Sequence, residues 1–135
     1  MRVVMDTGPW VALLDRNESK HGDCVNWFRG FEGEIFSSEA VLTEVLYLLN
    51  FSPKAQAAAI DFVLKGAIIL VPFSLESLKQ TRNLMEKYHD IPMDYADATL
   101  VCLAQDLSVN HIVTFDRKGF SIFRSTPRQY FTLIP

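Results

Sequence analysis

Short β-branched runs alternate with helical patterns along this chain, and that alternation limits the possible folds more than any other feature. Residues 2–5 and 67–71 are typical of strands buried on both faces, and residues 34–36 and 111–115 are weaker examples. Helical patterns separate these runs, at residues 8–14, 20–28, 39–49, 53–64, 75–88 and 95–107. Because parallel strands need crossover connections, the pattern predicts a mostly parallel sheet between helices.

We therefore expect one α/β domain over residues 1–135, built as a three-layer sandwich with helices on both faces of a four- to five-stranded, mostly parallel sheet. A hydrophobic content of 49% is enough for a sizeable core in a chain of 135 residues. The tail is expected to add a last strand, at either residues 121–123 or residues 130–133.

Composition excludes several classes of protein. The 13 Lys and Arg against 16 Asp and Glu give no global positive field for nucleic acid, so such a partner would need a local patch. Cys24 and Cys102 are isolated, which favours buried thiols over a disulfide or a zinc site. No stretch has the roughly 20 apolar residues of a membrane span, and no signal peptide is evident. The expected location is the cytoplasm.

Two of the expected strands end on an acid. Asp6 follows the strand in "RVVMD", and Asp116 follows the strand in "HIVTFD". In an open parallel sheet, ligands bind beyond the carboxyl ends of the strands. A single Asp at such a place often starts a turn or caps the next helix, but two strands of one sheet that end alike favour a shared site.

The helical segments carry acids in unusual places. Glu44 shares its helix face with apolar residues, by i±3 and i±4 spacing: Ala40, Val41, Tyr47, Leu48 and Phe51. Either it forms a buried ion pair or it belongs to a site. Asp97 lies on an otherwise apolar side of the helix at residues 95–107. Asp94 is a candidate N-cap of that helix, with Asp97 in its first turn.

These four acids, Asp6, Glu44, Asp97 and Asp116, would repel one another if they converged, by on the order of 4 kcal/mol for a pair 4 Å apart. Either some of them stay protonated or a divalent cation binds among them. The three histidines have no ligand spacing, which argues against zinc. Mg²⁺ or Mn²⁺ held by carboxylates points to phosphodiester hydrolysis.

Two other interpretations of the acids can be weighed. Asp6-Thr7-Gly8 matches the signature of an aspartic protease, but that fold is all-β and this chain is rich in helical pattern. A Mg²⁺-binding phosphoacceptor receiver domain also has an acidic pocket in a parallel α/β fold. Receivers pair their acids early and need a Lys after a late strand, whereas the late acid here is followed by Arg117 and Lys118.

Taken in order, the motifs "VVMDTGPWVALLD", "EAVLTEVLYLL", "PMDYADATLVCLA" and "HIVTFDRKGF" resemble those of the PIN-domain nucleases, in particular the VapC-type toxins of toxin–antitoxin systems. The resemblance spans nearly the whole chain. It places the four acids of the family on Asp6, Glu44, Asp97 and Asp116, and Asp94 resembles an additional acid that some members carry. Thr7 and Thr114 fall where members often have small polar residues.

The resemblance implies a Mg²⁺- or Mn²⁺-dependent endoribonuclease, a homodimer and a VapB-type antitoxin as partner. Asp6, Asp97 and Asp116 would hold the metal, and Glu44 would be a further ligand or the general base. Members of the family also serve in RNA processing, and some are catalytically silent modules that bind RNA or protein. Apolar residues at 45–49 and 62–64 leave room for a dimer interface.

A basic strip follows the last acid. From residue 117 to the end the chain has no Asp or Glu, and Tyr130 and Phe131 are expected to add aromatic surface. The strip contains four cationic side chains: Arg117, Lys118, Arg124 and Arg128. This strip is a candidate contact for the RNA backbone. A solvated basic edge is the alternative.

Overall fold

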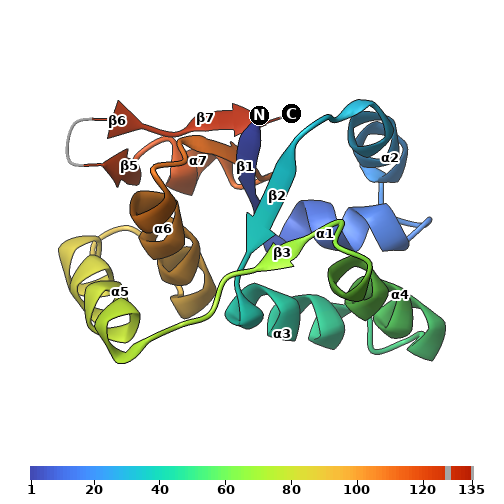
Figure 1. Ribbon diagram of the computed structural model, residues 1–135, viewed down its shortest axis with the longest axis horizontal. Helices are drawn as coiled ribbons and strands as arrows, with labels where there is room; N and C mark the ends of the chain where they lie inside the picture. Colours follow the sequence, from blue (N-terminus) through green and yellow to red (C-terminus); the bar gives the residue numbers. More distant parts are fainter. Residues whose placement is uncertain (127–128, 135) are drawn as a thin grey trace.

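A five-stranded parallel sheet forms the centre of the computed structural model, which describes residues 1–126 and 129–134 (Figure 1). The strand order is β3-β2-β1-β4-β7, and every neighbouring pair runs parallel. The strands are β1 (Arg2–Met5), β2 (Glu34–Ser37), β3 (Ile69–Leu70), β4 (His111–Val113) and β7 (Thr132–Ile134). This confirms the predicted α/β fold.

Helices cover the sheet on both sides. They are α1 (Thr7–Leu14), α2 (His21–Gly30), α3 (Glu39–Leu48), α4 (Pro53–Leu64), α5 (Leu75–Lys87), α6 (Tyr95–Leu107) and the short α7 (Arg117–Phe120). Figure 1 shows α5 and α6 to the left of β1, β2 and β3, and α1, α2 and α4 to their right. Helix α3 packs on both α1 and α6, near the carboxyl ends of the strands.

Local chemistry explains where these helices begin and end. Ser38, Ser52 and Ser74 each accept a hydrogen bond from a backbone N–H in the first turn of α3, α4 and α5. Helix α4 starts on Pro53 and stops just before Gly66, whose φ of 83° is the left-handed conformation that glycine adopts most easily. The predicted bounds of α4 and α6 agree with the structure.

The core lies on both faces of the central strands. Val3, Val4 and Met5 of β1 are fully buried, as are Ile112 and Val113 of β4. Helix α6 contributes a continuous buried segment from Ala98 to Ala104. Because β1 is in the middle of the sheet, the residue that follows it is fixed by packing on every side, and that residue is Asp6.

The third strand is shorter than predicted. Residues 67–71 were expected to form a strand buried on both faces, but β3 covers only Ile69–Leu70, and Ile69 is exposed. β3 is an edge strand that pairs with β2 alone, and Pro72, which follows Val71, has no N–H to extend a ladder. An apolar run therefore does not distinguish an edge strand from a central one.

The tail also differs in part from the prediction. Residues 121–123 form no strand, because the N–H groups of Ile122 and Phe123 donate to the carbonyl of Gly119 in a turn after α7. The alternative at residues 130–133 overlaps the observed β7. β5 (Arg124–Thr126) and β6 (Gln129–Tyr130) form a separate antiparallel pair.

Two expectations from composition can be compared with the structure. Cys24 and Cys102 are both buried free thiols, as predicted. In the described part of the chain, none of the helices has the length and apolar content that crossing a membrane requires. The parallel, helix-covered sheet also contradicts the all-β fold that an aspartic protease would need.

Candidate active site

Asp6 lies at the centre of the acidic site, between the end of β1 and the start of α1. Its backbone N–H donates to the carbonyl of Val113, which joins it to the end of β4. One carboxylate oxygen accepts from the N–H of Thr7 at 2.8 Å, and the other accepts from the hydroxyl of Thr114 at 2.8 Å. Only 9% of Asp6 is exposed. Burial raises its pKa, the two hydrogen bonds oppose this rise, and the charges of Asp116 and Asp94 add to it.

Thr114 connects Asp6 to Asp116. Its buried hydroxyl donates to Asp6 and accepts from the N–H of Asp116 at 2.9 Å. The Asp116 side chain in turn accepts from the N–H of Gly119 at 3.0 Å and so caps α7. Helix α7 was not predicted from the sequence, although an Asp three residues before the N–H that donates to it is ordinary N-cap spacing.

Replacing Thr114 by Val tests this connection. Val keeps the shape but leaves one oxygen of Asp6 and the N–H of Asp116 without partners, which costs roughly 1–3 kcal/mol in the free energy of unfolding. We expect a lower melting temperature and at least a tenfold loss of any activity of the site. Thr114→Ser, which keeps the hydroxyl, should restore both quantities. Equal behaviour of the Val and Ser variants would show that the hydroxyl has no such role.

Asp94 and Asp97 form a capping box at the start of α6. The Asp94 carboxylate accepts from the N–H of Asp97 at 2.8 Å, and the Asp97 carboxylate accepts from the N–H of Asp94 at 3.3 Å. This confirms that Asp94 is the N-cap. The pKa of Asp97 nevertheless rises to about 8, because of burial first and then the charges of Asp94, Asp6 and Asp116. A structural cap alone does not explain why Asp97 faces three other acids.

Glu44 reaches the same region from the middle of α3. Burial raises its pKa, and the charges of Asp94 and Asp6 raise it further. The Thr7 hydroxyl lowers the pKa of Glu44, which indicates that it lies toward this carboxylate. Its oxygen nevertheless makes no hydrogen bond to any described residue. Since Thr7 is only 9% exposed, its hydroxyl is a buried polar atom without a partner at the edge of the acidic site.

One expectation about Glu44 is wrong. Its helix face was predicted to point into the core, but Tyr47 and Phe51 on that face are 71% and 61% exposed. Among the residues predicted to share the face of Glu44, Val41 is buried, and it packs on the core together with Val45 and the following Leu49. Glu44 therefore lies at the border between this core face and the solvent, where it is half-buried and faces the other acids.

The acids converge from four separate segments, namely the end of β1, the middle of α3, the start of α6 and the cap of α7. Each raised pKa records repulsion by at least one of the other acids. Even so, no three His, Cys, Asp or Glu side chains among the described residues are grouped closely enough to form a ready-made metal site. Open pockets of about 330 Å³ and 390 Å³ adjoin these acids, the first beside Glu44 and Asp94 and the second beside Asp94 and Asp97.

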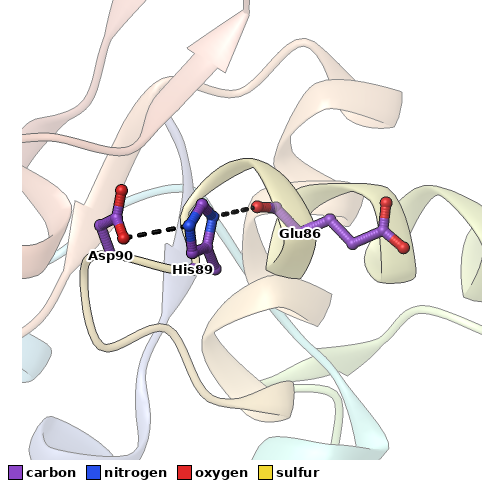
Figure 2. Close-up of polar contacts among 3 residues, drawn as sticks. All are labelled: Glu86, His89 and Asp90. Atoms are coloured by element: carbon purple, nitrogen blue, oxygen red, sulfur yellow. Dashed lines mark hydrogen bonds and ion pairs between the residues drawn. The ribbon is translucent and has the colours of Figure 1, made fainter.

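The donor atoms fit one kind of cation. Carboxylate oxygens and the unpartnered hydroxyl of Thr7 are the hard ligands that Mg²⁺ and Mn²⁺ prefer. The three histidines make their contacts elsewhere. Figure 2 shows the His89 ring between the carbonyl of Glu86, 2.8 Å away, and the carboxylate of Asp90, 3.0 Å away. His21 bonds to the carbonyl of Ala12, and His111 begins β4.

The basic strip lies in part next to the site. Arg117 and Lys118 are exposed on α7, directly after Asp116, while Arg124 is half-buried at the start of β5. Arg128 lies outside the described residues. Phe131 does not add aromatic surface, because it is 6% exposed and packs against Phe120 in the core.

Comparisons with known proteins identify similar sequences over nearly the whole chain. The family model of the PIN domain matches residues 3–126. Ribonuclease VapC26 of Mycobacterium tuberculosis is 27% identical over 135 residues, which covers 98% of this chain and 100% of that protein.

Solved structures share the fold. VapC20 of M. tuberculosis, described as a toxin that cleaves the sarcin–ricin loop, superposes with a TM-score of 0.82 at 20% identity, over 92% of this chain and 98% of that one. A toxin–antitoxin complex from Klebsiella pneumoniae gives a TM-score of 0.70 at 14% identity, over 98% of this chain and 96% of that one.

Proposed function

Since this chain belongs to the PIN-domain family, we propose that it is a Mg²⁺- or Mn²⁺-dependent endoribonuclease and the toxin of a toxin–antitoxin pair. One observation carries the proposal. Asp6, Glu44 and Asp97 converge from three separate elements, and their desolvation, together with the charges of neighbouring acids, raises the pKa of each. Such repulsion lowers stability and persists in a protein when the acids serve a site. The likeness to VapC26, a ribonuclease, supports RNA as the substrate.

Each acid has a role in the proposal. Asp6, Asp97 and Asp116 would hold the cation, and Thr114 keeps Asp6 and Asp116 in fixed relative positions by its two hydrogen bonds. Glu44 is either a further ligand or the general base that accepts a proton from the attacking water. The chemistry that a cation supplies when bound here is positive charge, which offsets the repulsion and stabilises the negative charge that develops on the phosphate.

An antitoxin and a second copy of the chain are the proposed protein partners. Large apolar side chains are strongly exposed on several helices, with Leu75 86%, Leu64 76% and Tyr47 71% accessible. Exposed apolar groups of this size are common where a protein binds another protein. The structural likeness to a chain of the K. pneumoniae toxin–antitoxin complex supports the antitoxin.

The proposed activity is tested by incubating the purified chain with mixed tRNA, rRNA and mRNA, in Mn²⁺ or in EDTA. We expect discrete RNA fragments with Mn²⁺ and intact RNA in EDTA. Thermal unfolding of the same samples gives a second measurement, because a cation that binds the folded chain raises its melting temperature. Cleavage that proceeds equally in EDTA would contradict a metal-dependent nuclease, and so would RNA that stays intact under all conditions.

A further inference from the structure

Lys20 and Phe115 form a cation–π pair that the roles proposed above do not use. The ammonium nitrogen of Lys20 lies 5.6 Å from the centre of the Phe115 ring, within the distance of about 6 Å at which such pairs attract. Phe115 lies between Thr114 and Asp116 in the chain. The loop that carries two residues of the acidic site therefore also holds this aromatic ring, and with it a cation.

Both partners of the pair are held in place. The ring packs against Gly8 of α1, where an added Cβ would come within 2.9 Å of it, so the glycine makes room for the ring. The carbonyl of Lys20 accepts from the N–H of Cys24 at 3.0 Å in the first turn of α2. The next residue, His21, is bonded through its ring nitrogen to the carbonyl of Ala12 in α1, at 2.6 Å. The turn that carries Lys20 is thus tied to α1, the helix that starts beside Asp6.

The ammonium of Lys20 is accessible and available for a ligand. Lys20 is exposed, and its side chain forms no ion pair with any carboxylate among the described residues, although Glu18 and Asp23 are near in sequence. Exposed Arg117 and Lys118 follow Asp116 on α7 and add positive charge after the same loop. An ammonium with a fixed base and free hydrogen-bond donors is suited to bind a phosphate.

We propose that Lys20, positioned by Phe115, binds a backbone phosphate of single-stranded RNA at the edge of the acidic site. This inference rests on the proposed ribonuclease function, which supplies the ligand. The acids of the site repel the RNA backbone, so cations beside them are needed to hold the phosphates that are not being cleaved. Lys20 carries such a charge and is far in sequence from residues 117–135, where the sequence analysis expected the RNA contacts.

The test measures binding of a fluorescently labelled single-stranded RNA by anisotropy, with the full chain in EDTA so that no cleavage occurs. Lys20→Gln is expected to weaken binding about 3- to 10-fold near 0.1 M salt. It should also lower the slope of log K against log salt by about 0.7, the value for one phosphate contact on a single strand. Lys20→Arg should bind like wild type. Lys65→Gln, at an exposed lysine after α4, is the matched control and should change neither quantity.

Phe115→Leu tests the positioning role. It should weaken binding less than Lys20→Gln does, and it should have no further effect in the Lys20→Gln background, because the ring acts through the ammonium. Thermal unfolding checks that both variants fold.

The outcomes separate the inference from the proposed function. If wild type binds and cleaves RNA but Lys20→Gln behaves like Lys65→Gln, the inference is wrong and the nuclease stands. If wild type neither binds nor cleaves RNA, both are wrong.

Discussion

Asp6→Asn is expected to reduce RNA cleavage by about 10³-fold or more, because it removes the charge at the centre of the acidic site. That factor corresponds to about 4 kcal/mol, the scale on which a correctly held cation stabilises charge on a reacting phosphate. The charge of Asp6, like that of Asp94, acts on both Glu44 and Asp97, but Asp6 is the more deeply buried of the two. Its loss therefore weakens the field of the whole site.

The fold should survive this substitution. Asn has the shape of Asp, and its oxygen can still accept from the N–H of Thr7 while its amide donates to the hydroxyl of Thr114. It also removes a buried charge that the neighbouring acids repel. We expect a melting temperature equal to that of wild type or higher, so a loss of cleavage cannot be attributed to unfolding.

The cleavage rate in Mn²⁺ and the melting temperature are measured on the same preparations. Asp61→Asn, at an exposed aspartate of α4, is the matched control and should leave both unchanged. If Asp6→Asn cleaved RNA at the wild-type rate, Asp6 would not belong to the active site, whatever its electrostatic environment.

The parallel sheet could be predicted because its signals are local. The β-branched strands, the Ser N-caps and the Pro53 and Gly66 boundaries of α4 are each written within a few residues. The extent of β3 could not be predicted, since its edge position depends on which strands lie beside it. The same limit applies to α7, whose four residues have too little periodicity to separate a helix from a turn.

The site was predictable in its members but not in its arrangement. Asp6 and Asp116 were found because each ends a strand, and parallel strands bring such ends to one edge. Helix α3 carries apolar residues on two faces. Residue spacing alone therefore allows either the face with Val41 and Val45 or the face with Glu44 and Tyr47 to pack against the core. Packing against α1 and α6 decides between them. The pairing of Lys20 with Phe115 joins two loops distant in sequence, and no local signal marks it.

Asp97→Asn is expected to make the metal-free chain more stable at alkaline pH. The pKa of Asp97 rises from its ordinary 3.8 to about 8 in the folded chain, chiefly because of burial. Below about pH 4, Asp97 is protonated in both states and its burial carries no charge penalty. Between pH 4 and pH 8 the unfolded chain releases this proton while the folded chain keeps it. The free energy of unfolding therefore falls as pH rises through this range. Above pH 8 Asp97 is ionised in both states, and the stability that its protonated form gave to the folded chain is lost.

Thermal unfolding in EDTA from pH 5 to pH 8 measures this effect. The melting temperature of wild type should fall toward pH 8, and that of Asp97→Asn should fall less. At pH 8 the variant should melt roughly 3–5 °C higher, which corresponds to about 1 kcal/mol for a domain of this size. The side-chain oxygen of the introduced asparagine can still accept from the N–H of Asp94, so the cap of α6 is kept.

Metal addition supplies the decisive comparison. Mg²⁺ should raise the melting temperature of wild type at pH 8 and should raise that of Asp97→Asn much less, because the cation binds the ionised acids of the folded chain. Asp61→Asn should follow wild type in both conditions. Parallel pH curves for wild type and Asp97→Asn would mean that Asp97 is ionised at neutral pH without a cation. The acids would then lie far enough apart to stay ionised without a cation, and their repulsion would give no reason for a metal to bind there.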